Sequence, residues 1–219
     1  MKQKTHQAKF AAKIKKWVEA AQQLRTENIR FALPITRLTS IKSLCQDEIA
    51  AQQFALYFSK QVEQQINTAS LASDFTPEEL EIHKSVIAEG IEMMERFLET
   101  PTHEGKQSIR KLLRQIDDLQ GDDVRNFRWS TVHFVRSGYL LKLDYALRCF
   151  VEPDFSTWAY KLAREYAEGY EPQYGTGLIP SSAPMLLEIA EFWCQYYLGQ
   201  SLTQKFPQLM KEDTLTNSS

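Results

Sequence analysis

Glycine and proline, the residues that most often interrupt regular structure, are scarce in this sequence. Each occurs only eight times in 219 residues. Nearly all of them lie between segments of helical periodicity rather than within alternating apolar and polar segments, which argues against many short strands and tight hairpins. The sequence therefore predicts an all-α fold, an irregular bundle of about seven or eight helices around a long central helix.

Cysteine is rare as well, and its three copies form no recognisable set. Cys45, Cys149 and Cys194 are widely separated, and neither a C-x-x-C pair nor a cluster of histidines accompanies them. This spacing indicates neither a disulfide framework nor a zinc site. We therefore predict reduced, mostly buried thiols and no cofactor.

A long uninterrupted apolar run is also missing. The N-terminal residues lack the apolar stretch of a secretory signal. The most apolar segment, residues 132–151, contains ionisable side chains that an ordinary membrane span does not tolerate, namely His133, Arg136, Lys142, Asp144 and Arg148. We therefore expect a soluble protein of the cytoplasm.

Motifs for catalysis are absent too. The histidines are isolated, without the Glu-x-x-His or His-Glu-x-x-His spacing from which helical bundles build metal sites. The chain has no G-x-S-x-G elbow, and the segment Gly175-Thr176-Gly177 is not followed by the Gly-Lys-Ser/Thr of a phosphate loop. We therefore predict no metal site and expect a non-enzymatic protein.

Signals at helix ends divide the chain into elements. Apolar periodicity predicts a first helix from about Ala8 to Glu27, and a second helix from Thr39 or Ser40 through Ile66 that carries Ile49 on its apolar face. The segment Thr76-Pro77-Glu78-Glu79 is typical of a helix start, because the first and last side chains can each bond the other's backbone amide. This third helix should end at Thr100-Pro101, and a fourth, ended by Gly121, should pack antiparallel to it.

The segment from Asp122 to Val151 is expected to be the central helix. It contains no breaker except Gly138, and its apolar residues lie nearly all round the cylinder. An unbroken helix of this length would extend about 45 Å, less with a kink at the glycine.

The C-terminal part should contain three further helices. Ser156 is the expected cap of the first, which Gly169 closes, and after a loop over residues 170–181 the next should run from Ser182 to Gly199. A short last helix follows. We expect a single domain over residues 1–211 and a disordered tail over residues 212–219.

Charge is unevenly distributed along the chain. Residues 1–30 hold eight Lys or Arg against two acids, whereas residues 74–104 hold nine acids against two bases. The first segment is expected to be a basic amphipathic helix, with interaction candidates Lys9, Lys13, Lys16 and Trp17. A bundle helix with solvated lysines is the alternative. Nucleic acid and an anionic membrane surface are further partners, but the pI near 6.1 disfavours the former.

Aromatic residues are concentrated in the second half. Of the 25 aromatic residues, 17 lie between Phe127 and Phe206. Such a concentration fits a wide core, an interface or a pocket for a flat apolar ligand. The candidate ligand-binding residues, on the central helix and the following loop, are Arg128, Trp129, His133, Arg136, Tyr170 and Tyr174. Buried cations there would need acidic partners, for which Glu165, Glu168, Glu188 and Glu191 are available.

Two functions from different classes remain. We favour a non-enzymatic interaction or adaptor protein that acts by protein–protein association or self-association. The alternative is a small-molecule binder or an enzyme with an aromatic pocket beneath the loop 170–181.

Overall fold

The computed structural model describes residues 2–26, 42, 44, 45, 47–68, 76–125, 131–167 and 183–210, and the side chains of 7–22, 42, 44, 45, 47–67, 76–120, 138–166 and 186–210. Every regular element in these ranges is an α-helix, which confirms the all-α prediction. Seven long helices and two of four residues each occur there, close to the expected number. The backbone forms two compact units, an internal unit over Ile41–Tyr166 and a terminal unit over Met1–Ser40 with Ala167–Ser219. The single domain stays a prediction.

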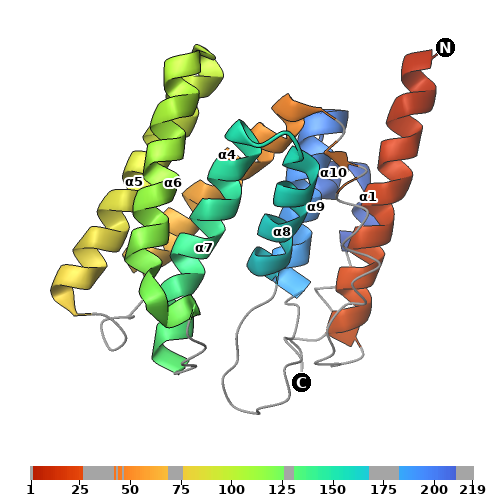
Figure 1. The fold of residues 1–219 in the computed structure, drawn as a ribbon. Helices are drawn as coiled ribbons and strands as arrows, with labels where there is room; N and C mark the ends of the chain where they lie inside the picture. Colours follow the sequence, from red (N-terminus) through yellow and green to blue (C-terminus); the bar gives the residue numbers. More distant parts are fainter. Residues whose placement is uncertain are drawn as a thin grey trace. The chain divides into compact units, whose positions relative to one another are not determined.

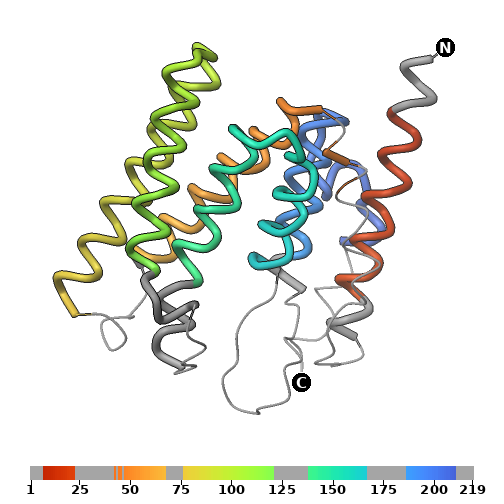
Figure 2. The backbone as a smooth tube through the Cα atoms, in the orientation of Figure 1, coloured from red at the N-terminus to blue at the C-terminus, as the bar shows by residue number. Residues whose placement is uncertain are grey.

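The internal unit is built around one helix. Its elements are α4 (Glu48–Thr68), α5 (Pro77–Glu99), α6 (His103–Arg125), α7 (Thr131–Val151) and α8 (Phe155–Ala167). Helix α7 contacts α4, α5 and α6 (Figure 1). Figure 2 shows the same helices as a backbone tube. The expectation that this apolar segment supplies the central helix is therefore confirmed for this unit.

The bounds of that central helix differ from the expectation. Helix α6 continues through Gly121 to its last residue at Arg125, and α7 begins at Thr131, so a single helix from Asp122 to Val151 is wrong. Glycine adopts helical φ as readily as positive φ, and hence a glycine alone does not end a helix. Helix α7 also runs through Gly138 as a helix, and its 21 residues extend about 32 Å.

Helix α4 begins later than expected. Cys45 is not helical and Asp47 lies in a bend, so one helix from Thr39 or Ser40 through Ile66 is wrong. The Asp47 carboxylate accepts a hydrogen bond from the Ala50 amide at 2.7 Å and so satisfies one of the free amides of the first turn. The two expected starts lie outside the described residues.

The start of α5 matches the prediction. The Thr76 hydroxyl accepts a bond from the Glu79 amide at 3.2 Å, and the Glu79 carboxylate accepts one from the Thr76 amide at 2.8 Å. Three residues separate the end of α5 from the start of α6, and the two helices lie side by side (Figure 1). The predicted antiparallel pair is thus confirmed.

The caps of the last two long helices are partly as expected. Asp154, and not Ser156, caps α8, because the Asp154 carboxylate accepts bonds from the Thr157 amide at 3.3 Å and from the Ser156 hydroxyl at 3.2 Å. A carboxylate in the residue before the helix is the stronger acceptor, and these bonds lower the pKa of Asp154. The predicted end at Gly199 is confirmed by its φ of 64°. Gly169, Ser182 and the tail lie outside the described residues.

The terminal unit pairs the two ends of the chain. Its helices are α1 (Lys2–Thr26), α9 (Ala183–Leu198), α10 (Leu202–Lys205) and α11 (Pro207–Met210). Helix α1 packs along α9, and the Phe10 and Tyr197 rings stack with their centres 3.9 Å apart. The Leu202 amide donates to the Glu191 carboxylate at 2.8 Å, which holds α10 against α9. The aromatic residues described here therefore serve core packing.

Candidate functional site

The exposed side of α1 carries the lysines that the sequence singles out. Lys9 and Lys16 are exposed, and Lys13 lies partly buried, with its Nζ 5.6 Å from the centre of the Phe10 ring. Because these positions are three and four residues apart, they lie on one side of the helix. We call Lys9, Lys13 and Lys16 the lysine face.

The lysine face contains like charges close together. Burial lowers the pKa of Lys13, and the charge of Lys9 lowers it further. Lys15, next in the chain to Lys16, pairs with Glu19 at 3.4 Å in an exposed contact of small energetic value. A negatively charged surface placed over the lysine face would relieve the repulsion between its members.

Trp17 has a different position from the lysines. It is only 6% exposed, and it belongs to the stripe that α1 buries, together with Phe10, Ile14, Val18 and Ala21. Trp17 therefore anchors α1 in the core of the terminal unit and is not presented to a partner.

A second charged surface follows the outer side of α5. Exposed positions recur there every three or four residues, opposite the buried side that contains Val86, Ile87, Gly90, Ile91, Met94 and Phe97. We call the exposed glutamates of this side the acidic face, which comprises Glu78, Glu81, Glu89, Glu92 and Glu99. Ile82, which is 46% exposed, lies among them.

Only part of the acidic face is neutralised within α5. Glu81 pairs with Lys84 at 3.1 Å, and Glu92 pairs with Arg96. Among the described residues no ion pair involves Glu78, Glu89 or Glu99. The acidic face therefore keeps a net negative charge along most of the helix.

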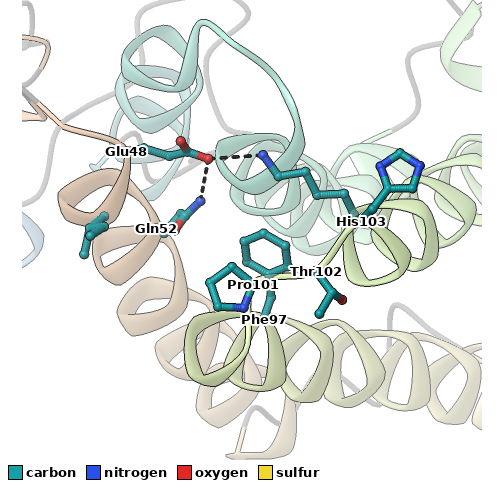
Figure 3. A pocket seen from close by; sticks show the side chains of 8 residues that line it. Glu48, Gln52, Phe97, Pro101, Thr102 and His103 are labelled. Carbon is teal, nitrogen blue, oxygen red and sulfur yellow. Dashed lines mark hydrogen bonds and ion pairs between the residues drawn. The ribbon is translucent and has the colours of Figure 1, made fainter.

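A groove of about 430 Å³ lies where the α5–α6 corner meets the first turn of α4 (Figure 3). Phe97 and Pro101 supply apolar surface, and Ile49, 62% exposed, lies at its rim instead of in the core as expected. The Glu48 carboxylate accepts a bond from Gln52 at 3.0 Å and pairs with Lys106 at 3.4 Å. The groove can hold an apolar side chain beside an ion pair. No sequence pattern predicts this groove, because its lining comes from three separate helices.

Charged and aromatic side chains also meet between α7 and α8. The guanidinium of Arg148 lies 4.8 Å from the centre of the Trp158 ring, and the amine of Lys161 lies 4.0 Å from it. The Tyr145 ring is 5.8 Å from that of Trp158. The contact of Arg148 with Trp158 joins the two helices and stabilises the packing of α8 on α7, whereas the contact of Lys161 with Trp158 lies within α8.

An ion pair accounts for part of the charge within the central helix. Arg148 donates to Asp144 at 2.8 Å, and Asp144 is only 5% exposed. Burial raises the pKa of Asp144, although the bond from Arg148 opposes the shift. Burial lowers the pKa of Lys142, and the nearby carboxylate of Glu165 partly restores it. Glu165 therefore acts on Lys142 through its charge, and the pairing of Arg128, His133 and Arg136 with acidic residues stays a prediction.

The predicted ligand-binding residues lie largely outside the described part of the chain. This holds for Arg128, Trp129, Tyr170 and Tyr174, and with them for the loop 170–181. His133 and Arg136 lie on the first two turns of α7, where the side chains are not described. The aromatic pocket therefore stays a prediction.

Comparison with known proteins identifies no relative. No family model matches the sequence, and no curated protein or solved structure is significantly similar to it. Within the described helices none combines the length and the apolar content needed to cross a membrane. The side chains described also contain no group of three or more His, Cys, Asp or Glu placed to hold a metal ion.

Proposed function

We propose that this protein acts by association, and that the lysine face of α1 binds an acidic surface of a protein partner. The observation that carries the proposal is the exposure of Lys9 and Lys16 on a helix whose apolar side is already buried against α9. Since the apolar side of α1 is buried in packing, the surface that this helix offers to a partner is its exposed side, which carries the lysine face. Exposed charge of one sign accelerates encounter with a surface of the opposite sign.

The burial of the apolar stripe favours a protein over a membrane. A helix that binds a bilayer inserts its apolar side among the lipids, which for α1 would expose Phe10, Ile14 and Trp17 from the core. Proteins that bind single-stranded nucleic acid stack its bases on aromatic side chains. The exposed side chains described on α1 include no aromatic one and are Gln7, Ala8, Lys9, Ala12, Lys15, Lys16 and Glu19.

The proposal requires no catalytic centre, and we place its action in the cytoplasm. All three cysteines are free and buried, as the sequence predicted. Free thiols are typical of reducing compartments.

Charge reversal on α1 tests this function. Deleting the helix would remove buried residues of the core, so we suggest the exposed double variant Lys9→Glu/Lys16→Glu as bait for affinity purification from the native cell. Its control is Lys111→Glu/Arg114→Glu, an equal change of charge at exposed positions of α6.

The recovered proteins are then compared by quantitative mass spectrometry. We expect at least one protein, or untagged copies of this chain, to be recovered about tenfold less with the α1 variant than with the wild type and the control. Equal recovery with all three baits would contradict the proposal. Small-molecule mass spectrometry of the same eluates tests the aromatic-pocket alternative, which a copurifying ligand would favour.

A further inference from the structure

We propose that the partner of the lysine face is the acidic face of α5 in a second copy of this chain, an inference that rests on the association function proposed above. Each copy then presents both halves of the contact.

Charge complementarity is the first argument. The lysine face and the acidic face are both exposed, and each carries mostly one sign of charge. Glu78, Glu89 and Glu99 have no ion-pair partner among the described residues, and Lys9 and Lys13 repel each other. Contact between the faces would place exposed lysines such as Lys9 and Lys16 opposite exposed glutamates such as Glu89 and Glu99.

The two helices also match in length and in small side chains. Helix α1 has 25 residues and α5 has 23, or about 38 Å and about 35 Å. Ala8 and Ala12 are exposed beside the lysines, and Ser85 and Ala88 beside the glutamates. Small side chains let helix axes approach to the short end of the usual 8–10 Å range, and Ile82 then offers an apolar contact.

A single pair of helices gives a small interface. One such contact buries less than the roughly 1,600 Å² of a standard protein–protein interface. We therefore expect weak association, with a dissociation constant of roughly 1 μM to 1 mM, and strong weakening by salt. Because the contact joins two different surfaces, it leads to an open chain of copies unless the assembly closes into a ring or a dimer.

A charge-swap experiment tests the pairing. The α1 variant is Lys9→Glu/Lys16→Glu, and the α5 variant is Glu89→Lys/Glu99→Lys, with Lys111→Glu/Arg114→Glu again the control. All of these positions are exposed, and thermal melts check that the variants fold. Light scattering then measures the molar mass of each protein and of an equal mixture of the α1 and α5 variants, at low salt and at a concentration of roughly 100 μM, within the expected affinity range.

The inference predicts a mass above that of the monomer for the wild type, the control and the mixture, and the monomer mass for each swapped variant alone. The mixture recovers because each variant has one face that complements a face of the other. A monomeric wild type, a mixture that stays monomeric, or a swapped variant that still assembles would overturn the inference. The proposed function would survive if the affinity-purification comparison still identified a different protein.

Cross-linking gives a second readout that needs no variant. A carbodiimide joins a lysine amine directly to a carboxylate, so an equal mixture of light-isotope and heavy-isotope protein shows whether a link joins two copies. We expect mixed-isotope peptides that connect Lys9, Lys13 or Lys16 to Glu89, Glu92 or Glu99. If these residues are linked only within single-isotope peptide pairs, the links lie within one copy and the inference is overturned. The absence of any link between these residues would overturn it as well.

Discussion

Asp144 is the described residue whose environment departs most clearly from that of a surface carboxylate. One of its oxygens accepts a bond from Arg148, whereas the other has no hydrogen-bond partner among the described groups and is buried. Burying a carboxylate without satisfying both oxygens costs free energy, and the protonated form is favoured in compensation. The Asp144–Arg148 pair therefore links two successive turns of α7, but the ionised form of Asp144 lowers the stability of the folded protein relative to the protonated form.

The pH dependence of unfolding should reveal this cost. Since burial raises the pKa of Asp144 in the folded state, its favourable contribution is complete below the ordinary value of about 3.9 and is lost as the pH rises through the raised value. Relative to Asp144→Asn, which does not titrate, the wild type should lose up to about 1.4 kcal/mol per pH unit within that interval. Urea unfolding of both proteins from acidic to neutral pH measures the difference. A difference that is constant, or that grows in favour of the wild type, would show that the pKa is not raised.

The cysteines should be unreactive while the protein is folded. Burial raises the pKa of Cys194 to about 11, so at pH 8 only about one thiol in a thousand is ionised. Burial also raises the pKa of Cys45 and Cys149. We expect a disulfide reagent to label all three thiols more than about a hundredfold faster in denaturant than in buffer. Rapid labelling of any one of them in the folded protein would contradict its burial.

At the scale of helices, the sequence predicts a helix boundary best where several neighbouring residues favour the same boundary. Thr76, Pro77 and Glu79 act within four residues of one another, and the start of α5 is found where they predict it. Gly121 and Ser156 gave wrong boundaries because each is one weak signal that a neighbour overrides: α6 continues past the glycine, and Asp154 captures the cap. Local chemistry of this kind decides the ends of helices, whereas the packing of one helix on another does not follow from it.

Two helical glycines should respond in opposite ways to alanine. A Cβ at Gly138 meets no atom within 4 Å among the described residues. Alanine there should stabilise the protein by about 0.5–1 kcal/mol, because it restricts the unfolded chain. A Cβ at Gly90 would lie 2.8 Å from Cδ1 of Leu143, which is 1% exposed and has little room to move. Gly90→Ala should therefore be less stable than Gly138→Ala by about 1–3 kcal/mol in denaturant unfolding. Equal stability of the two variants would show that α5 and α7 are not in close contact at this point.

For the whole molecule, the sequence predicts the lysine face of the proposed contact but not the acidic face. Lys9, Lys13 and Lys16 could be named because helical spacing places them on one side of a single helix. The glutamates of α5 were counted as negative charge, but which of them are exposed together depends on how α5 packs against α4, α6 and α7. The groove beside Phe97 could not be foreseen for the same reason, since its lining is contributed by three helices.

The salt dependence of the molar mass tests the central claim of charge-driven association most directly. The mass of the wild type at one protein concentration is measured by light scattering from about 0.01 M to about 1 M salt, over which the screening length falls from about 30 Å to about 3 Å. We predict a mass above that of the monomer at low salt and a continuous fall to the monomer mass as salt is added. A mass that is independent of salt, whether monomeric or assembled, would contradict association through the lysine face and the acidic face.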